Sequence, residues 1–107
     1  MKIQSIGFLI FDGFPMACLT SMIEPLRAAN EISGQDAFSW TLMAETIDKI
    51  CSSAGVNFEP DMVLAQAEGP DYLFLLSPPM AGFSNPKAGY GALRALGRHG
   101  TVLGGVS

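Results

Sequence analysis

The sequence has little basic charge and no cluster of basic residues. Its 107 residues include 6 lysines and arginines against 10 aspartates and glutamates, which gives a formal net charge of −4. No two basic residues are adjacent: they are Lys2, Arg27, Lys49, Lys87, Arg94 and Arg98. A protein that grips a phosphate backbone needs a positive patch, so we expect this chain not to bind DNA by itself.

Residues that commonly bind metals or form disulfides are also scarce. Cys18 and Cys51 are the only cysteines and His99 is the only histidine. Their spacing matches no metal site or disulfide framework, so we expect free thiols, no metal and no cofactor. No apolar run approaches the roughly 18 residues of a membrane span, and no signal peptide follows Lys2. We therefore expect a cytoplasmic protein without a membrane partner.

Apolar residues make up 49% of the chain, enough to build a core. Short apolar runs bounded by Gly, Pro or Asp predict strands at residues 6–11, 38–44, 72–76 and 101–106. Apolar residues at helical spacing predict helices at residues 19–32 and 87–98, with Pro25 kinking or dividing the first. This alternation predicts an α/β fold, a Rossmann-like (flavodoxin-like) sandwich around a mainly parallel sheet.

Two stretches between these elements are harder to assign. Residues 46–57 fit either a short hairpin or an edge segment, with a turn at residues 52–55. Residues 62–65 favour a short helical piece after the Pro60–Asp61 turn signal.

Ligands of open parallel sheets bind outside the carboxyl ends of the strands, where the loops carry polar residues. The loops after three predicted strands supply one carboxylate, two hydroxyls and apolar walls, which suits a small metabolite. The predicted ligand-binding residues are Phe11, Asp12, Gly13, Phe14, Ser77, Pro78, Pro79 and Ser107. For a quaternary amine, Phe11 or Phe14 would offer a cation–π surface and Asp12 the counter-charge. The alternative is that these loops are ordinary turns and strand terminators.

Three segments together carry a resemblance to a known family. They are residues 7–14 (GFLIFDGF), residues 24–30 (EPLRAAN) and residues 104–107 (GGVS). The chain resembles, over essentially its whole length, the N-terminal sensor domain of AraC-type transcription regulators, a PfpI-like member of the class I glutamine amidotransferase-like superfamily. The resemblance implies an effector-sensing domain at residues 1–107 that forms a homodimer and binds an amino acid or quaternary amine. DNA contact would come only from a C-terminal helix-turn-helix domain that is absent from this chain.

The resemblance also bears on catalysis, because enzymes of this superfamily place a cysteine on a sharp turn after a strand, with a carboxylate beside it. Ser107 occupies the position of that nucleophile and Cys18 the position of the acid, and a serine without an adjacent base is a poor nucleophile. His99 is expected at the opposite edge of the sheet. We therefore expect no enzymatic activity, and we expect the sandwich to be truncated after the strand that leads to the nucleophile elbow. The alternative is a PfpI-like hydrolase, an amidotransferase-type enzyme or a thiol stress protein.

Overall fold

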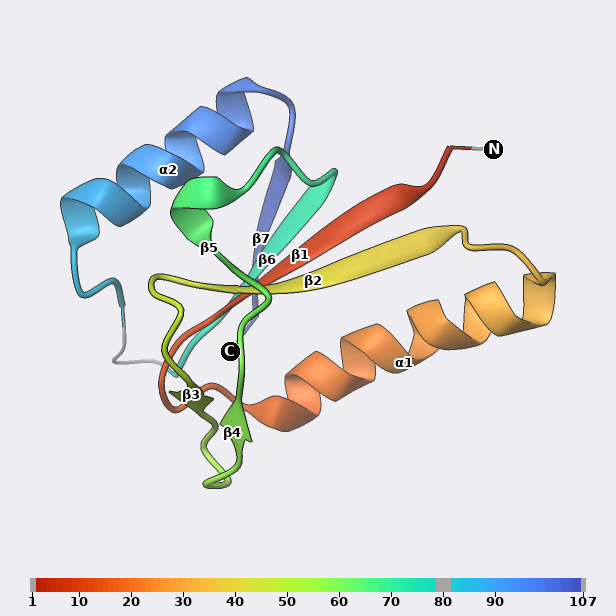
Figure 1. Ribbon diagram of the computed structural model, residues 1–107, viewed down its shortest axis with the longest axis horizontal. Coiled ribbons are helices and arrows are strands. Elements are labelled where there is room, and N and C mark those ends of the chain that lie inside the picture. Colours follow the sequence, from red (N-terminus) through yellow and green to blue (C-terminus); the bar gives the residue numbers. More distant parts are fainter. Residues whose placement is uncertain (1, 79–81, 107) are drawn as a thin grey trace.

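The computed structural model describes residues 2–78 and 82–106, and its centre is a five-stranded parallel sheet (Figure 1). The strand order is β5-β2-β1-β6-β7. The strands are β1 (Gln4–Ile10), β2 (Phe38–Ala44), β5 (Met62–Val63), β6 (Tyr72–Leu76) and β7 (Val102–Val106). The helices are α1 (Met16–Ser33) and α2 (Pro86–Arg98). The predicted flavodoxin-like α/β fold is confirmed.

The sheet lies between two helical layers. Helix α1 covers one face, whereas α2 and a short 3₁₀ helix, Leu64–Gln66, cover the other (Figure 1). The central strand β1 supplies both cores: Phe8 and Ile10 pack on the α1 side and Leu9 on the α2 side. All three side chains are fully buried, which explains why this run is almost entirely apolar.

Helix α1 continues through Pro25, so of the two predicted outcomes the division into two helices is wrong, and the predicted kink stays a prediction. A proline in a helix interior removes one backbone hydrogen bond, here the one to the carbonyl of Ser21. Both Pro25 and Ser21 are exposed, so water can satisfy that carbonyl. The helix instead ends at Gly34, whose φ of +70° closes the last turn by a hydrogen bond to the Glu31 carbonyl.

The ambiguous stretch after β2 forms the hairpin that was one of its two predicted readings. Strands β3 (Ile50–Cys51) and β4 (Asn57–Phe58) pair antiparallel. The predicted helical piece at residues 62–65 is only partly correct, because Met62 and Val63 pair with β2 as β5 before the 3₁₀ helix begins. Pairing with Met43 and Ala44 extends the sheet and overrides the local helical tendency.

The amino ends of β1 and β6 are joined by a side-chain lock. The Asp71 carboxylate accepts hydrogen bonds from the Ser5 backbone N–H (2.8 Å) and hydroxyl (3.3 Å). The Ser5 hydroxyl in turn accepts a hydrogen bond from the Asp71 backbone N–H (3.0 Å). Hydrogen bonding from the Ser5 backbone lowers the pKa of Asp71, so the charged form of this carboxyl is favoured in the fold.

Two further side chains fix the same edge. The Asn30 amide accepts from the backbone N–H of Phe38 and donates to its carbonyl, both at 2.9 Å. The Thr101 hydroxyl, buried at the start of β7, donates to the Pro70 carbonyl at 2.7 Å. Asn30 closes the 24–30 segment, so one residue of that motif braces the end of α1 against β2.

Candidate functional site

Polar loops meet at the opposite edge, where the parallel strands end. Asp12 follows β1, Glu45 follows β2 and Ser77 follows β6. The chain leaves β1 for β2 on one side, whereas β6 lies on the other side of β1, so the strand order reverses here. Open α/β sheets bind their ligands at such a reversal.

The Asp12–Gly13 turn packs closely against two other segments. Gly13 has a φ of +83° and its N–H donates to the Cys51 carbonyl at 2.7 Å. The Asp12 carboxylate accepts from the Cys51 N–H at 3.1 Å. A side chain at Gly13 would lie 3.3 Å from the Pro78 ring, so the structure brings these two predicted residues into contact. Ser77 is half-buried in the same loop region.

The two predicted aromatic walls lie mostly in the core. Phe14 is fully buried and packs edge-on against Phe58, with ring centroids 5.1 Å apart. Its ring therefore has no free face, and its predicted role as a ligand surface is not supported. Phe11 is 6% exposed and packs edge-on against Phe83 at 5.2 Å. Both aromatic residues come at the end of an apolar run or just after it, and such a position predicts a buried core side chain as readily as a pocket-lining one.

A hollow of about 220 Å³ opens beside these turns. We call it the acidic hollow. Its lining residues are Ile10, Phe11, Asp12, Glu45, Thr46, Asp48, Lys49, Ile50, Gly82 and Ser84. Among the described lining residues there are three carboxylates and one ammonium group, so the local charge favours a cation. Within residues 2–78 and 82–106, no group of three potential metal ligands lies close enough to hold a metal ion.

Glu45 has a second set of partners at the rim of the acidic hollow. Its carboxylate accepts two 2.9 Å contacts from the Ser84 N–H and a 3.3 Å bond from the Asn85 N–H. Asn85 caps α2 by accepting a hydrogen bond from the Ala88 N–H. The wall of the hollow is thus tied to the beginning of a helix.

Phe83 packs against the first turns of α2. Its ring lies edge-on to both Phe11 and Tyr90 and directly under Gly89, where a Cβ atom would come within 2.3 Å of the ring. Only a glycine in the first turns of α2 permits this approach. The start of α2 is therefore held by a ring on one side and a carboxylate on the other.

The predictions from sequence missed the loop after β2, which supplies Glu45, Thr46, Asp48 and Lys49. The signal was present, because Glu45 directly follows the predicted strand at residues 38–44. The rule that polar residues past the carboxyl ends of strands form the site applied to it as well. The contribution of Gly82 and Ser84 depends on how α2 packs, and no local pattern reveals that.

Cys18 and His99 do not line the acidic hollow. Cys18 is half-buried in the first turn of α1, among the apolar residues packed on that face of the sheet. His99 ends α2 beside the start of β7, at the edge where the strands begin. Pro79 and Ser107 fall outside the described residues, so their predicted roles stay predictions. Neither α1 nor α2 is long and apolar enough to cross a bilayer.

Comparison with curated proteins gives relatives of one kind. The chain is 32% identical over 103 residues to the HTH-type transcriptional regulator GbdR of Pseudomonas aeruginosa, covering 96% of this chain and 28% of that protein. It is 28% identical over 107 residues to the HTH-type transcriptional regulator GlxA of Rhizobium meliloti, covering 99% of this chain and 33% of that protein. The chain spans about a third of the length of these relatives. No family model matches the sequence.

Solved structures show the same fold. An AraC family transcriptional regulator from Pseudomonas putida matches with a TM-score of 0.82 at 23% identity, over 95% of this chain and 55% of that one. A DJ-1 superfamily protein from Salmonella typhimurium matches with a TM-score of 0.72 at 18% identity, over 98% of this chain and 56% of that one.

Proposed function

Because this chain is a homologue of HTH-type transcriptional regulators and has the DJ-1/PfpI-like α/β fold, we propose that it is the effector-sensing domain of an AraC-type regulator. The resemblance predicted from the sequence is confirmed at the level of these relatives and this fold. The effector that we propose is a small cationic or zwitterionic metabolite of the amino acid or quaternary amine class.

The acidic hollow is the observation that carries this proposal. Asp12, Glu45 and Asp48 line it against Lys49 alone, so a positive group entering it relieves repulsion between carboxylates. Its volume of about 220 Å³ lies below the roughly 300 Å³ at which drug-sized ligand pockets begin, which restricts the effector to a small molecule. Phe11 is also among the lining residues, although its side chain is mostly buried.

Titration calorimetry on the intact protein with a panel of amino acids and betaines tests the proposal. We expect at least one compound to bind, and Asp12→Asn to weaken that binding by about tenfold through loss of a close counter-charge. Asp36→Asn is the matched control, because Asp36 lies in the exposed turn between α1 and β2. Binding that Asp12→Asn weakens by less than about threefold, or no binding at all, would place the effector elsewhere.

In this proposal, a helix-turn-helix domain outside these 107 residues recognises the DNA. The regulator works in the cytoplasm. The chain has a net charge of −4 and its basic residues are dispersed. A mobility-shift assay with the 107-residue chain alone should therefore give no complex at modest salt. A salt-sensitive complex of micromolar affinity would contradict this assignment.

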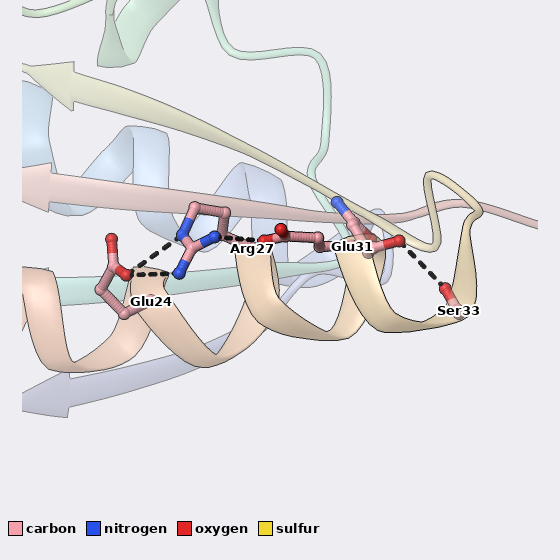
Figure 2. A network of polar contacts seen from close by, with 5 residues as sticks. Glu24, Arg27, Glu31 and Ser33 are labelled. Atoms are coloured by element: carbon pink, nitrogen blue, oxygen red, sulfur yellow. Dashed lines mark hydrogen bonds and ion pairs between the residues drawn. The ribbon is translucent and has the colours of Figure 1, made fainter.

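We also infer that the regulator works as a homodimer, since matched DNA half-sites call for two-fold symmetry. The candidate contact is the outer surface of α1 at residues 24–30. There Arg27 lies between Glu24, at 3.0 Å, and Glu31, at 2.6 Å (Figure 2). The hydrogen bond with Glu24 is the main cause that raises the pKa of Arg27, and the hydrogen bond with Glu31 adds to it. The side chains are more than half exposed and so are available to a partner.

Light scattering at tens of micromolar checks the dimer, with Arg27→Glu as the variant that places three acidic groups in a row. We expect dimer for the intact wild-type protein and monomer for Arg27→Glu. A protein that is monomeric with and without its effector would remove the dimer from the proposal.

The proposed domain has no catalytic role. Cys18 packs on the sheet, and His99 lies at the edge where the strands begin, so the described residues bring neither group to the acidic hollow. Amidase, protease and glyoxalase assays on the intact protein should give no turnover. Turnover that disappears in Ser107→Ala would favour the hydrolase or amidotransferase alternative instead.

A further inference from the structure

Glu45 belongs to two sites at once. Glu45 lines the acidic hollow, and both of its carboxylate oxygens accept hydrogen bonds from the backbone before α2. Asp12 and Asp48 line the same hollow without this second connection: Asp12 bonds to the hairpin at Cys51 and Asp48 to Thr46. Among the three carboxylates, Glu45 is therefore the one that joins the hollow to α2.

The Glu45 carboxylate can serve a ligand and the helix together. A carboxylate offers about four acceptor sites, and within residues 2–78 and 82–106 the N–H groups of Ser84 and Asn85 are the donors to them. A cation in the hollow also reduces repulsion from Asp12 and Asp48, which favours the position that Glu45 holds beneath α2. The carboxylate is thus placed to contact a ligand in the hollow and the backbone before α2 at the same time.

Helix α2 is in turn hydrogen-bonded to the segment directly before β7. The Leu96 carbonyl near the end of α2 accepts a hydrogen bond from the Thr101 N–H at 3.0 Å, directly before β7. The start of α2 also packs closely on Phe83 at Gly89. The hollow is connected in this way to the edge strand of the sheet.

We propose that Glu45 is the positioning residue that couples occupancy of the acidic hollow to the order of α2. The inference rests on the proposed effector site and adds the structural change that effector binding causes there. A bound cation shares the Glu45 carboxylate with Ser84 and Asn85 and tightens the beginning of α2. Effectors that fill the hollow without a positive group do not tighten it.

Amide hydrogen exchange of Ser84, Asn85 and Ala88 in the intact protein tests this coupling, together with calorimetry of the panel of amino acids and betaines. Without ligand, Glu45→Gln should exchange these amides faster than wild type, because the charged acceptor is lost while one oxygen remains. At saturating concentrations of the tightest-binding compound, wild-type exchange should slow by about fivefold or more, the lower range of allosteric coupling.

The matched variant is Asp12→Asn, which removes a charge from the same hollow but leaves Glu45 in place. At saturating ligand it should keep the slowed exchange, whereas Glu45→Gln should lose it. A role in folding alone would make the two ligand responses equal, so this difference isolates the coupling.

The outcomes separate the two proposals. If a compound binds at the hollow and exchange at Ser84 and Asn85 does not change, the coupling is wrong and the effector site stands. If Glu45→Gln leaves exchange unchanged without ligand, the tie to α2 is wrong whatever binds. If no compound binds, the effector site is wrong and the ligand-driven coupling falls with it.

Discussion

The two edges of the sheet use their polar side chains differently. At the edge where the strands begin, Asp71, Asn30 and Thr101 each bond to the backbone of a neighbouring segment. At the edge where the strands end, the carboxylates surround a hollow and keep part of their bonding capacity toward it, as Asp12 and Glu45 do. The first edge holds the strands in place, whereas the second is the edge that we propose for the effector.

We interpret the difference between the two edges as follows: side chains at the first edge stabilise the fold, whereas the carboxylates at the second lower stability and favour binding of a cation. Three carboxylates near one ammonium repel one another, and a sheet selected for stability alone would pair or remove them. Variants at the first edge should therefore change the free energy of unfolding, and variants at the second should change ligand affinity more than stability.

Asp71→Ala should give the largest loss of stability. It removes the acceptor of the Ser5 N–H and hydroxyl and leaves that half-buried N–H without its partner. Denaturant unfolding monitored by circular dichroism measures the change. A midpoint equal to that of wild type would show that the edge does not depend on this lock.

Asp71 also makes stability depend on pH. Its folded pKa lies below the ordinary value of 3.8, so its contribution is complete above that value and is lost as the pH falls through the folded pKa. Asp71→Asn should therefore flatten the loss of stability below about pH 4. An acid unfolding curve as steep as that of wild type would assign the effect to other carboxyl groups.

Asn30→Ala should cost about 2 kcal/mol, since it removes both hydrogen bonds to the Phe38 backbone. Urea unfolding gives this value directly. Ser33→Ala is the matched control at the end of the same helix, where the hydroxyl bonds only at the exposed surface (Figure 2). Equal losses in both variants would mean that fraying of α1, not the brace to β2, is being measured.

Thr101→Val should cost about 1 kcal/mol, because it replaces a buried hydroxyl by a methyl group of similar shape and leaves the Pro70 carbonyl without this partner. Differential scanning calorimetry would register a small drop in Tm. No drop would indicate that water replaces the hydroxyl at this carbonyl.

Asp48→Asn, at the other edge, should change stability by less than about 0.5 kcal/mol. Its side chain is exposed and bonds only to Thr46, and its removal relieves repulsion within the acidic hollow. The same variant should weaken binding of a cationic effector by calorimetry. A large loss of stability would end the contrast between the two edges.

The fold followed from the sequence because the four longer strands of the sheet are short, mainly apolar runs between turn residues, as in Tyr72–Leu76. Predictions failed where tertiary context decides: α1 tolerates Pro25 on its exposed side, and Met62 and Val63 join the sheet because β2 offers an edge. Of the predicted site, Gly13 and Pro78 meet as expected, whereas Phe14 lies in the core. Glu45 directly follows a predicted strand and could have been named, but its bonds to the N–H groups of Ser84 and Asn85, 39 and 40 residues further along the chain, could not be read from the sequence.

The order of the strands has a consequence for synthesis on the ribosome. Strand β1 emerges before β2 and can pair with it early, but its other neighbour is β6, and Ser5 bonds to a residue 66 positions later. Until β6 leaves the exit tunnel, the apolar edge of β1 has no partner, and such an edge invites pairing with another chain. A nascent chain that carries β1, α1 and β2 should therefore occupy holdase chaperones, and release should coincide with the appearance of Tyr72–Leu76.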